Sequence, residues 1–397
     1  MHYVMCSAGS FGDIFPFVKI GEQLKKNGHE VTILCHSFLH KVINSMGMGI
    51  IPLTPMPVPK LPKTFDSLET YQALMEEIVL PNMASLYQWI QAHGRAGEMV
   101  LISQRRLIGA RLANEKSGIP LLTVNLTPHE FENFLTQPPS VVNTLLSKPL
   151  NQYRKEIGLH ELDDVFNWLS SPDGIMAAFP SWFHTPDPSW PSQTWLSNFP
   201  YEAAGSKLPK SMDAFLKKGE KPVLFSFCPI LQDMDHCIQI AKRACHNLGK
   251  RAVIINRLPD QEFDISEDLF LAGYLTIDQL LPYISGIVYL GGAGTFGEAL
   301  RAGTPQLIIP IADNQRPQID FVENHGLGCV IDESRWTEEA VTQALDIITN
   351  NLELAQRCQM AAKKFGSKKE SLTHIAASIE SWANAHSSAT QPSPLRV

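Results

Sequence analysis

An apolar segment that runs into a cluster of glycines, residues 286–300, constrains the fold more than any other part of the chain. Its sequence is Gly-Ile-Val-Tyr-Leu-Gly-Gly-Ala-Gly-Thr-Phe-Gly-Glu-Ala-Leu. The first residues favour a short buried strand, and the residues after the glycines favour the start of a helix. Glycine has no Cβ, so its backbone can approach a ligand closely. The unpaired amides and positive dipole end of a helix N-terminus favour a phosphate at this turn.

Polar side chains near this turn suit the rest of a nucleotide. Thr295 offers a hydroxyl to a phosphate oxygen, and Glu298, one turn later, offers a carboxylate to ribose hydroxyls. A second polar group, Asp313, Asn314 and Gln315, follows the next apolar strand. Loops at the carboxyl ends of parallel strands converge, so both groups are predicted to face one site. An ordinary Rossmann-like turn without a sugar ligand is the alternative interpretation.

Strands and helices alternate in two series along the chain, which indicates an α/β protein with two domains. In the first series, strands are expected at residues 2–7, 30–35, 50–53, 99–103 and 119–125. A second series opens at residues 222–227 and contains the glycine-rich turn. Such alternation is typical of a parallel sheet covered by helices on both faces. A length of 397 residues suits two such domains.

Changes in composition place the domain boundaries. Residues 127–152 show no regular pattern and are predicted to form a long loop, followed by a helix over 153–168. A polar, lysine-rich stretch over 205–221 is interpreted as the interdomain connection. The predicted parts are an N-terminal domain 1–205, a C-terminal domain 206–375, a final helix 376–386 and a disordered Ser/Pro-rich tail 387–397.

Composition limits the possible partners. The net charge of −7, from 33 basic and 40 acidic residues, gives no support for nucleic-acid binding. The seven cysteines are scattered without a Cys-x-x-Cys pair, which favours free thiols in a reducing compartment and no zinc site. No apolar run approaches the roughly 18 residues needed to span a bilayer. We therefore expect a cytoplasmic protein without a transmembrane segment, either monomer or homodimer; peripheral membrane contact stays open.

Several motifs of the C-terminal half resemble the donor-binding half of family-1 nucleotide-sugar glycosyltransferases with the GT-B fold. They are the glycine cluster 291–295, Glu-Ala-Leu at 298–300, Ala-Gly-Thr-Pro-Gln at 302–306 and the Asn-Gln pair at 314–315. In the N-terminal half, residues 7–17 resemble the family's opening motif, particularly in its bacterial rhamnosyltransferase-chain-B and sterol-glucosyltransferase-like branches. Further matches to the rhamnosyltransferase branch are residues 115–120, 171–174 and 179–183.

The resemblance covers most of the chain and implies two Rossmann-like, doubly wound domains that face a central cleft. It implies that the N-terminal domain binds the acceptor, the C-terminal domain binds the donor, and the final helix crosses back to the N-terminal domain. The donor-binding residues that we predict with it are Gly12, Tyr289, Gly291, Gly292, Ala293, Gly294, Thr295, Glu298, Asp313, Asn314 and Gln315. Among these, residues 291–295 would hold the diphosphate, Glu298 the ribose, and Asn314 and Gln315 the sugar hydroxyls.

The same resemblance implies that Asp13 is the general base. A base takes the proton of the acceptor hydroxyl while the nucleotide diphosphate leaves. Backbone amides hold the growing negative charge on the phosphates, so no metal or other cofactor is expected. In-line displacement would invert the anomeric configuration. As an alternative role, an Asp just before an apolar-periodic segment, here expected to be helical from Pro16, is also a good N-cap.

The chain departs from the family pattern near the predicted diphosphate site. Tyr289 and Leu290 stand where the family commonly has a histidine, and Cys228-Pro229 replaces a glycine-serine pair. Asn314 replaces an acidic residue. Loss of a charge-assisted contact of roughly 1.5–3 kcal/mol weakens diphosphate binding at least tenfold. An altered donor preference, or a catalytically silent GT-B protein that binds a ligand or activates a partner enzyme, therefore stays open.

Aromatic residues in loops and at element ends predict an apolar acceptor site. The acceptor-binding candidates are Phe11, Phe15, His129, Phe131 and Phe134. Such a site favours a lipid or a hydrophobic natural product, and the likeness to rhamnolipid-forming enzymes implies a hydroxy-fatty-acid-like acceptor. Alternatively, the nearby aromatic residues pack the interdomain segment; these are Trp182, Phe183, Trp190 and Trp195.

The predicted activity is transfer of a hexose, or a deoxyhexose such as rhamnose, from a UDP- or dTDP-sugar. Two other enzyme classes are disfavoured. A dehydrogenase would need Gly-x-Gly-x-x-Gly after the first strand, where only Gly9-x-x-Gly12 occurs. A sugar-nucleotide epimerase would need extra carboxylates in the cleft, and none can be identified in the sequence. Histidines in or beside the first strands are interpreted as structural; these are His2, His29, His36 and His40.

Overall fold

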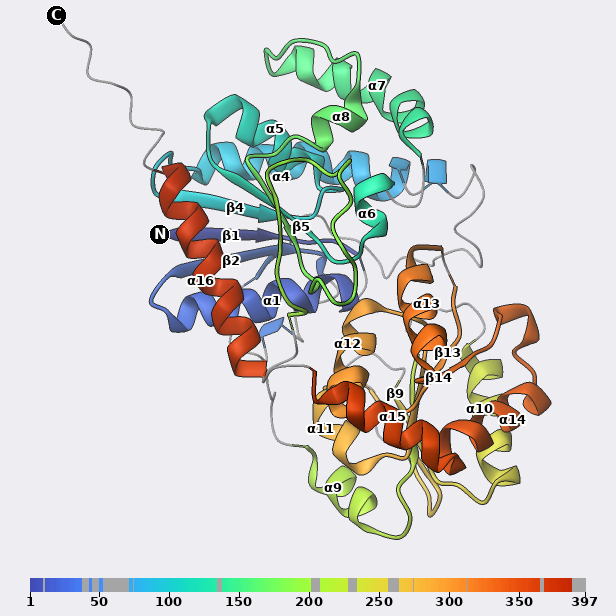
Figure 1. Ribbon diagram of the computed structural model, residues 1–397. Coiled ribbons are helices and arrows are strands. Elements are labelled where there is room, and N and C mark those ends of the chain that lie inside the picture. Colours follow the sequence, from blue (N-terminus) through green and yellow to red (C-terminus); the bar gives the residue numbers. More distant parts are fainter. Residues whose placement is uncertain are drawn as a thin grey trace, which may run out of the picture. The chain divides into compact units, whose positions relative to one another are not determined.

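The computed structural model consists of two compact units, each built on its own sheet (Figure 1). Unit 1 contains Met1–Pro57, Asp66–Pro200 and Lys369–Val397, and unit 2 contains Val58–Phe65 and Tyr201–Lys368. The structure describes residues 1–9, 11–37, 43–44, 50–52, 71–73, 75–133, 138–200, 208–227, 234–255, 264–273, 275–311, 313–364 and 368–387.

Among the described residues, the sheet of unit 1 has seven strands in the order β3-β2-β1-β4-β5-β6-β7, and every neighbouring pair is parallel. The strands are β1 His2–Cys6, β2 Glu30–Cys35, β3 Ile50–Pro52, β4 Met99–Ser103, β5 Leu121–Asn125, β6 Gly174–Ala177 and β7 Thr194–Leu196. All five residues of β4 are buried, as expected for a parallel strand covered on both faces. The order reverses between β1 and β4, so the loops after these two strands leave the sheet side by side.

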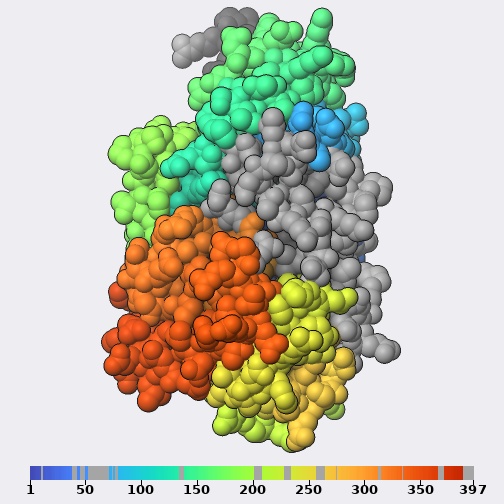
Figure 2. All heavy atoms as spheres, turned by 90° about the vertical axis from the view of Figure 1, so that its right-hand side faces the viewer, coloured from blue at the N-terminus to red at the C-terminus, as the bar shows by residue number. Residues whose placement is uncertain are grey.

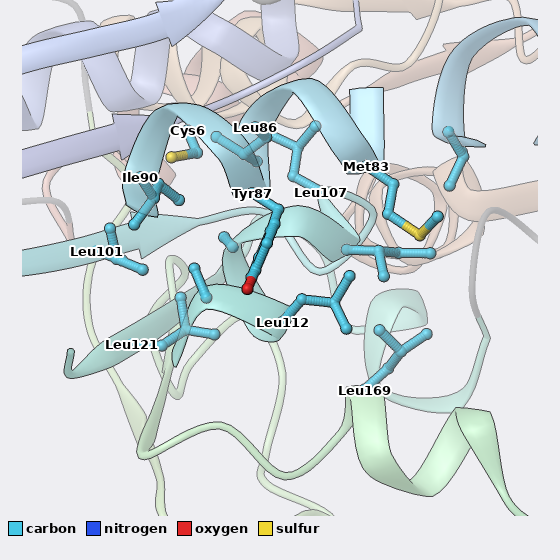
Figure 3. Packing of buried hydrophobic residues seen from close by; sticks show 14 of the residues in the cluster. Cys6, Met83, Leu86, Tyr87, Ile90, Leu101, Leu107, Leu112, Leu121 and Leu169 are labelled. Atoms are coloured by element: carbon cyan, nitrogen blue, oxygen red, sulfur yellow. The ribbon is translucent and has the colours of Figure 1, made fainter. Parts of the chain in front are cut away.

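Helices cover both faces of this sheet. They are α1 Phe11–Lys26, the π-helix η2 Met75–Val79, α4 Leu80–His93, α5 Ile108–Ser117, α6 His129–Glu132, α7 Pro139–Glu156, α8 Val165–Leu169 and α16 Lys368–Ser387. Helices α1 and α16 pack on one face, and α4 and α5 pack on the other (Figure 1). In Figure 3, leucine side chains from α4, α5, β4 and β5 surround Tyr87 of α4.

The last helix of the chain packs on the first sheet. Ile375, Ala376 and Ile379 of α16 are buried in the same apolar cluster as α1. Trp382 lies so close to β6 that a Cβ added to Gly174 would be 2.5 Å from the indole Nε1 of Trp382. The glycine of the Ser-Pro-Asp-Gly motif therefore makes room for this helix.

The predicted loop over residues 127–152 is wrong, because most of this stretch is helical. Helix α7 begins at Pro139 and continues through Pro149 to Glu156. Val142, Leu146 and Leu150 are buried at intervals of four residues, which is the apolar stripe of an amphipathic helix. The two prolines concealed this spacing. The predicted helix over 153–168 is instead the end of α7, a connection, and the short α8.

In the part of unit 2 that the structure describes, the sheet also has seven strands, in the order β10-β11-β9-β8-β12-β13-β14. The strands are β8 Val223–Ser226, β9 Ala252–Ile255, β10 Asp264–Ile265, β11 Leu269–Ala272, β12 Gly286–Tyr289, β13 Gln306–Ile308 and β14 Gly328–Val330. Only β10 is antiparallel to its neighbour among these described strands. The order reverses between β8 and β12, so the glycine-rich turn after β12 lies at this switch point.

The helical segments of unit 2 are α9 Lys210–Lys217, α10 Met234–Asn247, α11 Ile277–Leu280, η3 Leu281–Tyr283, α12 Ala293–Ala302, η4 Asp313–Gln315, α13 Arg316–His325, η5 Glu333–Arg335, α14 Glu338–Asn350 and α15 Leu352–Ala362. Helix α14 buries Val341, Ala344, Leu345 and Ile348 against the sheet. Figure 2 shows one face of this unit, with the yellow atoms of α10 beside the orange atoms of the α13–α15 segment. Helix α9 lies within residues 205–221, the stretch interpreted from the sequence as the interdomain connection. The predicted boundary at residue 205 and the tail after residue 387 fall outside the described residues.

Candidate functional site

The predicted site residues that the structure describes lie at the carboxyl edges of the two sheets. In unit 2, the turn at residues 290–292 follows β12. In unit 1, the turn that leads to Asp13 follows β1, and a second loop follows β4. Both positions are switch points of strand order, where ligands bind in open parallel sheets.

In unit 2, Gly291 has a backbone conformation that requires glycine. Its φ is +85°, and a Cβ at this position would meet the Gln315 side chain at 3.1–3.2 Å. Gln315 in turn accepts a hydrogen bond from the Ile311 amide at 2.8 Å. The turn after β12 and the loop after β13 therefore pack directly against each other, as the sequence predicted for the two polar groups.

The N-terminus of α12 presents backbone amides without a side-chain cap. The first bond of the helix runs from the Phe296 amide to the Gly292 carbonyl at 3.0 Å, so the amides of Ala293, Gly294 and Thr295 precede it. The N-cap residue of this helix is Gly292, which has no side chain that could cap it. Gly292 and Gly294 are exposed, and a Cβ on either would meet no atom within 4 Å. This arrangement is suited to a phosphate group.

The two side chains that replace the family's histidine point into unit 2. The Tyr289 hydroxyl donates to Gln306 Oε1 at 2.6 Å, and the residue is 1% exposed. Burial raises the pKa of Tyr289 well above its ordinary value. Leu290 packs against the apolar cluster beneath α10 and α14. The Tyr289 hydroxyl is thus already engaged in the core, and any part of this residue in donor binding would fall to its backbone.

Polar residues around the turn differ in their surroundings. Glu298 is 2% exposed, and its carboxylate accepts hydrogen bonds from Arg301 at 2.8 and 3.1 Å. Asn314 Oδ1 is buried and has no hydrogen-bond partner among the described residues. Such an acceptor can bind a ligand hydroxyl. Asp313 begins η4, but its side chain lies outside the description. The predicted ribose and sugar contacts stay predictions.

In unit 1, Asp13 lies at the centre of a polar cluster. Helix α1 begins at Phe11, so Asp13 is inside its first turn and is not at the N-cap position. The earlier start than predicted shows that Pro16 is tolerated inside this helix. Asp13 Oδ1 accepts from Arg106 Nη2 at 2.5 Å and from Gln104 Nε2 at 3.5 Å. Gln104 Oε1 accepts from the Ala8 amide at 2.9 Å, which ties the loop after β4 to the turn after β1.

Gly9 makes room for this ion pair. Its φ is +121°, and a Cβ there would lie 2.5 Å from Asp13 Oδ2 and 3.3 Å from Arg106 Nη1. A side chain at this position would displace both the carboxylate and the guanidinium. Gly12, the next glycine of the motif, lies in the first turn of α1 and is exposed. Its predicted donor contact is a prediction still.

Two further titratable groups lie near this ion pair. His36, directly after β2, is fully buried. Burial and the positive charge of Arg106 lower the pKa of His36 to about 4, although the negative charge of Asp13 acts in the opposite direction. The His36 ring is therefore neutral at pH 7. Burial raises the pKa of Glu130, against the opposing effect of Arg106. The sequence pattern predicts a structural role for His36 and does not indicate the other members of the cluster; these are Gln104, Arg106 and Glu130.

A signal for these residues exists in the sequence. Gln104 and Arg106 follow β4 as Asp13 follows β1, and neighbouring parallel strands end at one edge. The strand order, however, is not written in the sequence. Without it, the loop after β4 could not be paired with the loop after β1.

The predicted acceptor residues are largely packed within unit 1. Phe15 is 5% exposed, and Phe131 is 8% exposed and stacks on Trp190 with ring centroids 3.8 Å apart. His184 stacks on the same tryptophan at 5.5 Å. His129 Nδ1 lies 3.4 Å from Asn133 Nδ2. The side chain of Phe11 and the whole of Phe134 lie outside the described residues.

This aromatic packing favours the alternative interpretation for part of the set. Trp190 and Phe183 are both 9% exposed, and Trp195 packs near Trp382 of α16 with centroids 6.2 Å apart. Trp182 is 36% exposed. These rings therefore stabilise the segment around β7, and Trp182 has the largest exposure among them.

Two properties of the described residues bear on other classes of site. None of the described helices has both the length and the apolar character needed to cross a bilayer. Within the same residues, no three His, Cys, Asp or Glu side chains gather as a metal-binding group.

Comparison with known proteins gives matches in both units. Residues 3–136 match the glycosyltransferase family 28 N-terminal domain. Residues 252–379 match the erythromycin biosynthesis protein CIII-like C-terminal domain. The first match contains Asp13 and Arg106, and the second contains the glycine-rich turn.

Sequence relatives are distant but cover most of the chain. The sterol 3-beta-glucosyltransferase of Saccharomyces cerevisiae (strain YJM789) is 24% identical over 94% of this chain and 34% of that protein. The chain thus spans about a third of the length of this relative. Glycosyltransferase GtfE of Amycolatopsis orientalis is 24% identical over 87% of this chain and 89% of that protein.

The fold has close structural counterparts. Spinosyn rhamnosyltransferase SpnG, solved in complex with thymidine diphosphate, superimposes with a TM-score of 0.68 at 17% identity. The match covers 96% of this chain and 99% of that one. The predicted fold class is therefore confirmed. One unit matches a glycosyltransferase family 28 N-terminal domain and the other an erythromycin biosynthesis protein CIII-like C-terminal domain, so the chain is a glycosyltransferase of the GT-B type.

Proposed function

We propose that the protein transfers a sugar from a nucleoside diphosphate donor to a hydroxyl group of a hydrophobic acceptor, with inversion at the anomeric carbon. The N-terminus of α12 carries this proposal. There, exposed glycines and backbone amides without a side-chain cap provide a binding site for a diphosphate. Because the side chains of Tyr289 and Leu290 point into unit 2, the diphosphate would be bound there by backbone amides and not by these two side chains.

Each group has one task in the proposed reaction. The acceptor oxygen forms a bond to the anomeric carbon as the bond from that carbon to the diphosphate oxygen breaks. Asp13 takes the proton of the acceptor hydroxyl. The amides of Ala293, Gly294 and Thr295 hold the negative charge that develops on the leaving diphosphate. The products are the glycoside, the nucleoside diphosphate and a proton.

The proposed donor is a dTDP- or UDP-sugar, such as a deoxyhexose donor. SpnG is a rhamnosyltransferase and was solved with thymidine diphosphate, which supports a dTDP donor by analogy. The unpartnered Asn314 Oδ1 supports a contact with a sugar hydroxyl beside the glycine turn. Because Glu298 is held by Arg301, a ribose contact through this carboxylate requires that it share its oxygens with the arginine.

The proposed acceptor is a lipid or a hydrophobic natural product. The named activity of the Saccharomyces cerevisiae relative is transfer to a sterol. In this chain, Phe15 and Phe131 are buried in the same unit as Asp13, so an acceptor would contact only the small exposed part of each ring. This class of acceptor needs apolar walls and one hydroxyl within reach of a base.

Donor binding and turnover test the proposal. The protein is titrated with dTDP, UDP and their sugars in a thermal-shift assay, and nucleoside diphosphate release is then measured with sterol, hydroxy-fatty-acid and macrolide acceptors. We expect donor-dependent stabilisation and turnover, with turnover lost in Asp13→Asn but stabilisation retained. Stabilisation without turnover by any acceptor favours a silent binding protein. No response to any nucleotide at millimolar concentration contradicts both.

A further inference from the structure

We infer that Arg106 is a positioning residue for the base: it holds the Asp13 carboxylate in the orientation that accepts the proton. This inference depends on the proposed function, because it assigns a role within that reaction. Arg106 itself does not contact substrate in this inference and acts through Asp13.

The two residues meet only through the topology of the sheet. Asp13 belongs to the helix after β1, and Arg106 belongs to the loop after β4, 93 positions away. Strands β1 and β4 are neighbours at the switch point. The side chains of Asp13 and Arg106 are 25% and 18% exposed, respectively, so the ion pair is shielded from much of the solvent without being closed to a ligand.

The contacts restrict the carboxylate to one orientation. An Asp side chain in the first turn of a helix can rotate about two bonds, and only some orientations suit proton transfer. Arg106 and Gln104 both donate to Oδ1, and Oδ2 lies over Gly9. The absence of a Cβ at Gly9 is what allows the carboxylate to lie there. Three residues from two segments, the loop after β4 and the turn after β1, therefore define the position of this group.

The charges around Arg106 support the same role. His36 is neutral at pH 7, because burial lowers its pKa to about 4. Glu130 lies within electrostatic range of both Arg106 and Asp13. The positive charge of Arg106 therefore balances Asp13 directly and also counteracts the effect of burial on the pKa of Glu130. A neutral residue at position 106 would remove this balance.

The neighbouring arginine provides a matched control. Arg105 Nη1 donates to Ser170 Oγ at 3.0 Å, Nη2 donates to the Asn133 carbonyl, and its guanidinium lies over the Phe166 ring. It thus braces the helix α8 region and has no hydrogen bond to Asp13 among those found in the described residues. Arg105→Lys retains the charge next to the cluster while altering an arginine of similar exposure.

The experiment measures transfer kinetics and donor-induced stabilisation for Arg106→Ala, Arg106→Lys, Asp13→Asn, the Arg106→Ala/Asp13→Asn double variant, and Arg105→Lys. We expect kcat of Arg106→Ala to fall about 100-fold, as for a misplaced catalytic group. The KM for the donor should change less than about twofold, because the interaction is not with the ground-state donor. Low millimolar guanidinium should restore kcat of Arg106→Ala about tenfold or more, and Arg105→Lys should retain kcat.

The double variant separates positioning from an independent effect. If Arg106 acts through Asp13, adding Arg106→Ala to Asp13→Asn causes no further loss. Guanidinium should restore nothing to Asp13→Asn. A folded Arg106→Ala variant with wild-type kcat, a fully additive double variant, or failure of guanidinium to restore activity would each overturn the inference. Turnover by the wild type would still support the proposed function.

Arg106→Lys covers the case in which the alanine variant does not fold. Lysine keeps the charge but loses the guanidinium geometry, so we expect an intermediate kcat. A Lys variant with wild-type kcat and stability would show that charge alone is required and would overturn the positioning role. Absence of turnover by the wild-type protein with every donor and acceptor would overturn the proposed function, and this inference with it.

Discussion

Gly294→Ala should raise stability and weaken nucleotide binding at the same time. Gly294 lies in the first turn of α12, is exposed, and offers open space to a Cβ. Alanine in place of glycine within a helix stabilises it by about 0.5–1 kcal/mol. For a domain of 150–250 residues, this corresponds to a rise in Tm of about 1–4 °C. Packing alone would therefore present the variant as an improvement.

Binding should change in the opposite direction. Every Cα–Cβ bond of a helix tilts toward the N-terminus, so the new methyl group points into the space in front of α12. A phosphate seated there would lose one hydrogen bond to a charged group, about 1.5–3 kcal/mol. The Kd for dTDP or UDP should then rise about 10- to 150-fold. Isothermal titration with each nucleoside diphosphate, without the sugar, measures this directly.

Gly291→Ala is the comparison variant. The positive φ of Gly291 costs a non-glycine residue about 1–2 kcal/mol, and the new Cβ would also displace Gln315. This variant should therefore weaken binding and lower Tm together. A Gly294→Ala protein that is more stable and binds both nucleotides with unchanged Kd would refute the assignment of the diphosphate to this helix end.

Three further predictions concern unit 1. Gly174→Ala should lower the free energy of unfolding by about 1–3 kcal/mol, because the new Cβ would lie 2.5 Å from the Trp382 indole; Trp382→Phe in the same background should recover part of the loss in urea denaturation. Arg154→Met should cost about 1.5–3 kcal/mol, because Glu115 loses the two Arg154 hydrogen bonds at 2.7 and 2.9 Å but is 30% exposed and keeps the Trp168 hydrogen bond. Burial alone would raise the pKa of Glu115, but the Arg154 hydrogen bonds bring it below its ordinary value. The stability that Glu115 contributes to the wild-type protein should therefore be lost as the pH falls below about 4.5. An Arg154→Met variant whose free energy of unfolding falls equally steeply with pH would contradict this. Burial lowers the pKa of His36 from 6.5 to about 4, so the unfolded chain binds a proton at a higher pH than the folded chain does. As the pH falls from 6.5 to 4, His36 should therefore lower the free energy of unfolding by about 3 kcal/mol. His36→Asn should reduce this loss, measured by denaturation at pH 7 and pH 4.5.

Family and fold class could be predicted from the sequence because their signals are local. The strand–glycine–helix pattern at residues 286–300 requires only apolar periodicity and the special conformations of glycine. The observed φ of +85° at Gly291 shows why this position has glycine. Local sequence patterns did not predict helix α7, because Pro139 and Pro149 concealed an apolar stripe that the fold buries.

Tertiary structure decided which distant residues act together. Arg106 meets Asp13 across 93 positions because β1 and β4 are neighbours in the sheet, and strand order leaves no mark in local periodicity. In the same way, Tyr289 reads in sequence as a polar neighbour of the glycine turn, but its hydroxyl is bound to Gln306 inside unit 2. Sequence alone thus determined which backbone segments can form the edges of the sheets. Side-chain partners across those edges depend on strand order and burial, and only the folded chain sets both.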